Sequence, residues 1–161
     1  MPAYAVIIKK VETQRVAQAR AKAPDMSKLG STLDHLFDSV LTYARNHHAL
    51  LPEPNPSITV YYDEEFGEQN IDVGACVYVN NTLVGDGQVE VLDLPGYESV
   101  ASVIHHGPFV TLPGAYSAVS GWIEANHYQI CGPARELNLE YERGGDQSKY
   151  VTEVQFPVKK A

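Results

Sequence analysis

The carboxylate of Glu136 is the side chain for which this sequence most clearly suggests a chemical task. It opens a segment, 136–141, in which Glu136, Asn138 and Glu140 alternate with Leu, Leu and Tyr. A period of two is typical of a β-strand with one apolar face, so the three polar side chains share the other face. That face is either solvated, as for most strand carboxylates, or turned towards a binding site.

In a binding site, a carboxylate beside aromatic rings suits a flat lipophilic cation. The rings attract the cation by about 0.5 to 2 kcal/mol, and the carboxylate neutralises its charge. A partly desolvated carboxylate without a partner is costly, so the charge of the ligand should affect its affinity. Asn138 is a second polar candidate, and the aromatic candidates are Tyr61, Tyr78, Tyr116 and Trp122.

Two of these aromatic assignments have open alternatives. Trp122 lies on the apolar face of a predicted helix, where a tryptophan more often belongs to the core than to a ligand site. Tyr61 is assigned from an internal repeat described below, and a slip of one residue would exchange it with Tyr62.

Other reactive residues show no established arrangement. The histidines lack a metal-ligand spacing such as HExxH, and we place them in loops and at helix ends, with His105-His106 just before a turn at Gly107-Pro108. Cys76 and Cys131 form no CxxC motif, and neither a phosphate loop nor a nucleophile elbow is present. We therefore expect no metal and no cofactor.

The composition indicates one globular domain over 1–161, since 44% of the residues are apolar and 20% are charged. The net charge of −8 and the scattered basic residues argue against direct binding to nucleic acid. No apolar run is long enough for a membrane span, and the N-terminus does not have the pattern of a signal peptide. We expect a cytoplasmic protein.

Hydrophobic periodicity predicts two helices among several strands. One helix begins after Ser31 as N-cap, following a loop around Pro24 and Gly30, and ends near Asn46; the other is capped by Thr111 and ends near Asn126. A proline-rich loop at 51–56 leads into the third strand. The predicted strands are 5–8, 15–20, 57–62, 73–79, 89–92, 97–104, 136–141 and 151–158.

The order of these elements indicates an internal duplication. An offset of 79 residues places 75–79 over 154–158 and also places Ser57, Thr59 and Tyr61 over Glu136, Asn138 and Glu140. We predict two repeats, about 4–79 and 88–160, related by a pseudo-twofold axis. Each repeat would bury the leucine face of its sheet under its own helix. The face of Glu136 would then look into a central groove between the repeats, a common place for a small-molecule site.

The chain resembles a known family at several short motifs in a consistent order. These are Val-Glu-Thr-Gln-Arg-Val-Ala (11–17), Val-Tyr-Tyr-Asp-Glu (60–64), Leu-Pro-Gly-Tyr (94–97), His-His-Gly-Pro-Phe (105–109), Gly-Pro-Ala-Arg-Glu (132–136) and Val-Thr-Glu-Val-Gln-Phe-Pro-Val (151–158). On them the chain resembles the GyrI-like effector-binding domain, which is also the C-terminal drug-sensing half of MerR-class multidrug regulators and accompanies some AraC-class ones.

The resemblance implies an α+β fold of two β-α-β-β repeats, with antiparallel sheets that carry a helix on one face. It also implies that the ligand-contacting glutamate of the family falls on Glu136. Many members of the family carry a tyrosine two residues later, where this sequence has Asn138. That difference weakens stacking on this side of the groove and removes any catalytic role of the tyrosine.

The expected function is to bind amphipathic, cationic aromatic molecules as a sensor, a sequestering protein or the effector domain of a transcription regulator. One alternative is a hydrolase of cyclopropane-bearing electrophiles, a reaction that the resemblance associates with some standalone members, with Glu136 acting on water. Another alternative is a protein that inhibits a DNA-acting enzyme, as the name-giving member of the family inhibits a topoisomerase. The sequence leaves the ligand, the oligomeric state and any protein partner open.

Overall fold

The computed structural model describes residues 4–65 and 67–161, which fold as an α+β protein with antiparallel sheets and helices α1 and α2. The chain divides into two compact units. Unit 1 consists of the residues up to Val11 together with Tyr97–Ala161, and unit 2 consists of Glu12–Gly96. No helix in the described part of the chain is long and apolar enough to cross a membrane.

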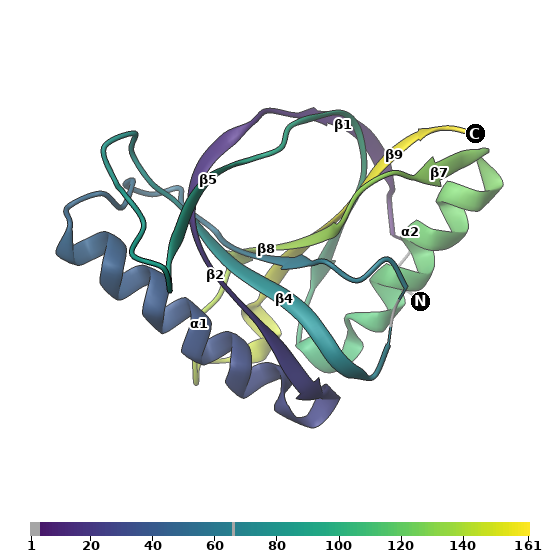
Figure 1. The fold of residues 1–161 in the computed structure, drawn as a ribbon. Helices are drawn as coiled ribbons and strands as arrows, with labels where there is room; N and C mark the ends of the chain where they lie inside the picture. Colours follow the sequence, from purple (N-terminus) through teal and green to yellow (C-terminus); the bar gives the residue numbers. More distant parts are fainter. Residues whose placement is uncertain (1–3, 66) are drawn as a thin grey trace. The chain divides into compact units, whose positions relative to one another are not determined.

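Unit 2 is an antiparallel sheet with α1 (Met26–Asn46) packed on one face, as Figure 1 shows. Its strand order is β3-β4-β2-β5, and α1 packs against β2 and β4. The helix buries Leu36, Phe37, Val40 and Ala44. The strands are β2 (Gln14–Asp25), β3 (Ser57–Tyr61), β4 (Gln69–Tyr78) and β5 (Glu90–Leu94).

Small residues on β2 let α1 lie close to this sheet. Ala17, Ala19 and Ala23 are buried in the cluster beneath α1, opposite Val77, Ala75 and Ile71 of β4. The alanines predict a weak strand by propensity. Pairing with both β4 and β5 stabilises β2 regardless of that propensity.

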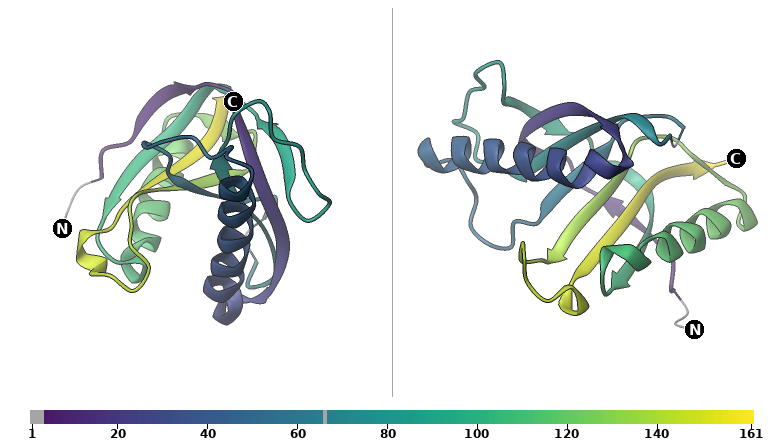
Figure 2. Two further views of the ribbon diagram at one scale, coloured as in Figure 1. Left: turned by 90° about the vertical axis from the view of Figure 1, so that its left-hand side faces the viewer. Right: turned by 90° about the horizontal axis from the view of Figure 1, so that it is seen from below.

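The strands of unit 1 also pair antiparallel, in the order β1-β6-β9-β8, with β7 paired to the end of β9. Helix α2 (Pro113–Ala125) packs on β6, β7 and β9, and Figure 2 shows it running beside β9. Beneath α2 lies a buried cluster that includes Ala101, Val119 and Val154. The other elements are β1 (Ile7–Val11), β6 (Tyr97–His106), β7 (Tyr128–Ile130), β8 (Ala134–Glu140), β9 (Val151–Lys160) and the short 3-10 helices η1 (Phe109–Thr111) and η2 (Gln147–Lys149).

The two units share an order of elements. In unit 2, α1 follows β2 and precedes the antiparallel pair β3 and β4. In unit 1, α2 follows β6 and precedes the antiparallel pair β8 and β9, with β7 between. The sheet orders β3-β4-β2-β5 and β8-β9-β6-β1 correspond strand by strand.

The first helix begins five residues before its predicted N-cap, so the prediction of a loop around Pro24 and Gly30 is wrong. Strand β2 continues to Asp25, whose side chain accepts a hydrogen bond from the backbone N–H of Lys28 at 3.2 Å and so acts as the N-cap. Because β5 pairs only with residues 14–18 of β2, Pro24 lies where β2 has a single neighbour, and its missing donor is tolerated. Gly30 lies inside the helix with open space around its Cα.

Replacing Asp25 by alanine is expected to lower the melting temperature, whereas Asp25→Asn should largely preserve it. Alanine removes the acceptor for Lys28 N–H, and asparagine is as good an N-cap as aspartate. Thermal unfolding followed by circular dichroism measures both variants. Equal losses in the two variants would show that the charge of Asp25, rather than capping, stabilises the start of α1.

The second helix also begins differently from the prediction. Its N-cap position is Leu112, with Pro113 at the first helical position as predicted, while Thr111 ends η1. The placement of His105-His106 in a loop is wrong, because both residues end β6, and the chain bends directly after them at Gly107. His105 is 2% exposed, and its Nδ1 lies 2.8 Å from the hydroxyl of Tyr4.

The predicted proline-rich loop at 51–56 is confirmed, and one amide side chain in it completes the sheet. Asn55 Oδ1 accepts a hydrogen bond from the N–H of Tyr78 at 2.9 Å, and Asn55 Nδ2 donates to the carbonyl of Tyr78 at 2.9 Å. Strand β3 pairs with β4 only as far as Cys76, so Asn55 satisfies backbone groups of β4 just beyond β3.

Candidate functional site

Glu136 projects from the face of β8 that carries α2. Its cross-strand partner is Val154, which belongs to the buried cluster beneath α2. The hydroxyl of Tyr116, on α2, donates a hydrogen bond to Oε2 of Glu136. The prediction that the leucine face lies under the helix is therefore wrong for β8, because Leu137 projects from the opposite face beside its partner Glu153.

The error has a structural cause. Both faces of β8 are at least partly buried: Arg135 is 4% exposed and Leu137 is 9% exposed, while Glu136 is half-buried on the other side. Alternation alone shows that two faces differ, but not which of them lies under a helix. The main contacts of α2 are with β6, β7 and β9, so β8 lies beside them and polar residues can occupy its α2 face.

Aromatic side chains from α2, β7 and β9 pack against the buried cluster beneath α2. Tyr116 packs edge-on against Phe156 of β9, with ring centroids 5.8 Å apart and an interplanar angle of 90°. Trp122 stacks on Tyr128 at 5.6 Å and 23°. All four rings are partly buried and pack against the cluster beneath α2. Half-buried rings of this kind offer apolar area and electron-rich faces to a ligand.

The face of the second aromatic pair already attracts a cation. Lys160 Nζ lies 4.3 Å from the centroid of the Tyr128 ring. An ammonium at this distance is stabilised by the ring quadrupole, by about 0.5 to 1 kcal/mol at an exposed site. The aromatic residues near α2 therefore include a ring that can bind positive charge.

Asn138 and Thr152 extend the polar row from Glu136. They are cross-strand partners, and Asn138 lies on the face of Glu136, two residues along the strand. Oγ1 of Thr152 is buried and has no hydrogen-bond partner among the described residues. A buried hydroxyl left unsatisfied costs about 1 to 3 kcal/mol, so a ligand atom that bonded to Thr152 would recover part of that cost.

Tyr61 and Tyr78, the remaining predicted site residues, belong to unit 2. Tyr61 packs against the cluster beneath α1, on the helix side of its own sheet. Its neighbour Tyr62 points to the opposite face, where the guanidinium of Arg20 lies 3.7 Å from the ring centroid. The choice between Tyr61 and Tyr62 is thus one between two faces of the sheet. Tyr78 is half-buried, and its backbone is bound by Asn55.

The cluster around Tyr62 is polar and tightly packed. Arg20 binds Asp72 through two hydrogen bonds, of 2.8 and 2.7 Å, which raise the pKa of the Arg20 guanidinium and lower the pKa of the Asp72 carboxyl. Burial raises the pKa of Tyr62, whose hydroxyl donates to Gln18. A Cβ on Gly74 would lie 2.4 Å from Oε1 of Gln18, so only glycine leaves room for this arrangement.

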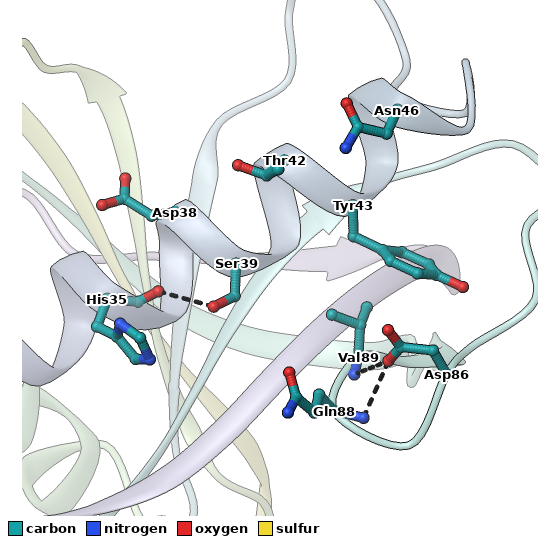
Figure 3. Close-up of a pocket in the computed structure, with 9 residues that line it drawn as sticks. All are labelled: His35, Asp38, Ser39, Thr42, Tyr43, Asn46, Asp86, Gln88 and Val89. Atoms are coloured by element: carbon teal, nitrogen blue, oxygen red, sulfur yellow. Dashed lines mark hydrogen bonds between the residues drawn. The ribbon is translucent and has the colours of Figure 1, made fainter.

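A shallow depression of about 410 Å³ lies elsewhere, between α1 and the loop before β5 (Figure 3). Its polar lining includes His35, Ser39 and Asp86, and Asp86 caps its own loop by accepting from the N–H groups of Gln88 and Val89. It belongs to unit 2 and shares no residue with the surroundings of Glu136. We base the candidate site on Glu136 because a carboxylate with aromatic neighbours has a definable ligand chemistry.

Residues suited to hold a metal do not gather in the described ranges 4–65 and 67–161: no group of three or more His, Cys, Asp or Glu has a suitable geometry there. Cys76 is buried and Cys131 is exposed, and neither forms a disulfide within the described residues. The chemistry available beside α2 is therefore that of a carboxylate, a phenol and aromatic faces.

Sequence reasoning found Glu136, Tyr116, Trp122 and Asn138, and the structure places all four in unit 1. It missed Phe156, Tyr128 and Thr152. The signal for Phe156 was available, since alternation in the last strand puts it on the same face as Val154. Nothing in the sequence indicates that Tyr128 stacks on Trp122 or that Thr152 lacks a partner, because both depend on tertiary packing.

Comparison with known proteins shows the family of this chain and its fold. The family model described as the GyrI-like small molecule binding domain matches residues 4–159. The EcmrR C-terminal domain superposes with a TM-score of 0.86 at 29% identity, over 98% of this chain and 99% of that one. No curated protein matches the chain in sequence.

Two further solved structures are similar. EcmrR in complex with DNA matches with a TM-score of 0.87 at 27% identity, over 100% of this chain, which spans 59% of that longer chain. SAV2435, whose structure was solved bound to tetraphenylphosphonium, matches with a TM-score of 0.68 at 10% identity, over 96% of this chain and 94% of that one. The likeness to SAV2435 is one of fold.

Proposed function

Because the chain belongs to the GyrI-like small-molecule-binding family, we propose that it binds amphipathic cationic aromatic molecules beside α2, with Glu136 as the counter-charge. The observation that carries the proposal is the position of Glu136: a half-buried carboxylate, bonded to the hydroxyl of Tyr116 and beside the rings packed under α2.

The partial burial of Glu136 supports a preference for cations. A carboxylate removed from water loses solvation, and hydrogen bonds or an opposite charge must replace it. The hydroxyl of Tyr116 supplies one such hydrogen bond. A cationic ligand would add an opposite charge, while Tyr116, Phe156 and Trp122 supply apolar contact and cation–π attraction.

The comparisons support a sensing role. The EcmrR chain that this protein matches is bound to DNA and is longer than this chain. By that likeness, we propose that this chain serves as a sensor, a sequestering protein or the effector domain of a transcription regulator. The bound cation of SAV2435 supports the ligand class, and we use it as a probe.

The architecture proposed with this function is a single domain over 1–161, built from two repeats of about 4–79 and 88–160 with a pseudo-twofold relation. The matching strand orders of the two units support it. In each repeat the strand that carries Tyr61 or Glu136 presents that residue towards its own helix.

Tetraphenylphosphonium is expected to bind the wild type, and Glu136→Gln is expected to weaken that binding about tenfold or more. The variant keeps the shape of the side chain and removes its charge, and tenfold corresponds to about 1.4 kcal/mol. Titration calorimetry measures both affinities. Triphenylphosphine oxide, a neutral molecule of similar shape, should distinguish poorly between the two proteins.

Glu140→Gln is the matched control, because Glu140 ends the same strand but is exposed. It should bind the phosphonium as the wild type does. Equal weakening in both variants would mean that net charge, rather than the site, attracts the cation, and unchanged binding in Glu136→Gln would remove Glu136 from the site.

A further inference from the structure

The shallow depression beside α1, of about 410 Å³, lies between two polar walls of unit 2. One wall is a stripe of polar side chains on α1. Its members recur at helical spacing and so share one face of the helix: His35, Ser39, Thr42 and Asn46. The other wall is the loop before β5, which contributes Gln88. In Figure 3 the side chains of His35 and Gln88 project into the space between the two walls.

The loop wall is held in place by its own hydrogen bonds and by two buried side chains. Oδ1 of Asp86 accepts from the N–H groups of Gln88 at 2.9 Å and Val89 at 2.8 Å, and the N–H of Asp86 donates to the carbonyl of Val89 at 3.1 Å. Leu83 and Val89 are 4% and 3% exposed and anchor the loop in the cluster beneath α1. Because both walls are ordered beforehand, a ligand would lose little affinity to ordering them.

Tyr43 connects the helix to the loop and adds an aromatic ring to the depression. Its hydroxyl donates a hydrogen bond to the carbonyl of Val84, and its ring packs against His47 with centroids 4.3 Å apart. The same side chain also lines a second depression, of about 290 Å³, together with Thr82 and Gly85. The half-buried ring of Tyr43 can therefore contact the carbon atoms of a small cyclic ligand.

The charges of this lining are negative. Asp38 and Asp86 contribute carboxylates, and the lining contains neither lysine nor arginine. Hydrogen bonds from the backbone N–H groups of Val89 and Gln88 hold the pKa of the Asp86 carboxyl below its ordinary value, so this group is ionised at neutral pH. Most small-molecule pockets are lined chiefly by apolar side chains, whereas hydroxyls, amides and carboxylates predominate here. Such a lining favours a ligand that is both polar and cationic.

We propose that this depression binds a small hydroxylated amine, such as an amino sugar or an aminocyclitol. The ammonium groups bind the carboxylates of Asp38 and Asp86 by charge-assisted hydrogen bonds. The ring hydroxyls bond to Thr42 and Gln88. The site shares no residue with the surroundings of Glu136, and its ligand is a polar cation rather than a lipophilic one. It therefore stands separately from the function proposed above.

The test uses 2-deoxystreptamine, a cyclohexane ring that carries both amines and hydroxyls. One comparator is myo-inositol, which has hydroxyls but no amine, and the other is cis-1,3-diaminocyclohexane, which has amines but no hydroxyl. In two-dimensional NMR spectra of the intact protein, 2-deoxystreptamine should shift the backbone amides of Ser39, Tyr43 and Gln88. It should bind about fivefold or more tightly than either comparator.

Two variants remove the charges of the site. Asp38→Asn and Asp86→Ser should each reduce the preference for 2-deoxystreptamine over myo-inositol by about threefold or more. Serine is chosen at position 86 because its hydroxyl can still accept from the N–H groups that follow it in the loop. Asp93→Asn is the matched control, since Asp93 is an exposed carboxylate of unit 2 outside the depression, and it should leave binding unchanged.

Thr42→Val tests the hydroxyl contacts, because it keeps the shape of an exposed side chain and removes only its hydroxyl. It should weaken the binding of 2-deoxystreptamine and leave that of cis-1,3-diaminocyclohexane unchanged. Glu136→Gln should alter neither, so a failure of this site is distinguishable from a failure of the site beside α2. The same spectra report whether each variant is folded.

The proposal is overturned if either comparator binds as tightly as 2-deoxystreptamine. It is equally overturned if the shifted amides lie outside α1 and the loop before β5, or if no amide moves at the highest soluble concentration of the probe. Weakening by Asp93→Asn as large as that by Asp38→Asn would show that net charge, rather than this depression, attracts the amine.

Discussion

Replacing Leu36 by alanine is expected to lower the free energy of unfolding by about 3 kcal/mol. Leu36 is 6% exposed and lies in the cluster between α1 and the sheet of unit 2. Removing a buried leucine side chain costs about 2 to 5 kcal/mol, since apolar area is lost and a cavity remains. Alanine is a slightly better helix former than leucine, so helix propensity does not add to this cost.

Leu51→Ala is the matched control, because the same atoms are removed from a leucine of unit 2 that is 37% exposed. It should lower stability by less than about 1 kcal/mol, in proportion to its smaller buried area. Urea unfolding followed by circular dichroism measures both variants. Similar losses in the two would mean that the packing of α1 adds little stability to this unit.

Replacing Lys9 by methionine is expected to lower the free energy of unfolding at pH 7 by about 1 to 2 kcal/mol. The substitution leaves the buried Glu153 without its ammonium partner. Breaking a fully buried pair costs about 3 to 5 kcal/mol. The expected cost is smaller here, because Lys9 is 39% exposed and solvent weakens its attraction, and because Ser102 and Gln155 still donate to the carboxylate.

The loss in Lys9→Met should shrink as the pH falls. The folded state of the wild type holds the pKa of Glu153 below its ordinary value of 4.5, so its contribution to stability is present above that pH and is lost as the pH falls through the folded pKa. In the variant, burial acts against fewer opposing interactions and the pKa rises. The two proteins should therefore approach equal stability in acid.

Urea titrations of both proteins at pH 7 and near pH 4 measure this difference. A gap that stayed constant between the two pH values would mean that Lys9 stabilises the fold through packing of its aliphatic stem rather than through Glu153. Lys10→Met is the control, since the side chain of Lys10 is 56% exposed and lies 3.7 Å from the exposed Glu98. It should change stability little at either pH.

The pattern of the sequence was sufficient for the fold class and for most elements. Strands rich in β-branched residues, such as β3 and β4, were located within a few residues. The start of α1 could not be inferred, because Pro24 and Gly30 both suggest a loop. Pro24 is tolerated because β2 has only one neighbouring strand there, and Gly30 is tolerated because it lies on an open side of the helix. Both reasons depend on tertiary structure, which the local sequence does not show.

The candidate residues on β8 share one face of the strand as predicted, but the sequence did not show which face lies under the helix. Alternation selected Glu136 and Asn138 correctly as one face of a strand. The side occupied by a helix depends on how α2 packs, and the bond from Tyr116 to Glu136 joins residues on different elements.

The side chain of Asn55 substitutes for a peptide group at the edge of the sheet, since it both donates to and accepts from the backbone of Tyr78. Hydrolysis of this amide to a carboxylate would remove the donor and break one of the two bonds. The common route to that damage requires the next backbone N–H to attack the side-chain amide, and the next residue is Pro56, which has none. Pro56 therefore protects the side-chain amide of Asn55, which joins this loop to β4, from deamidation.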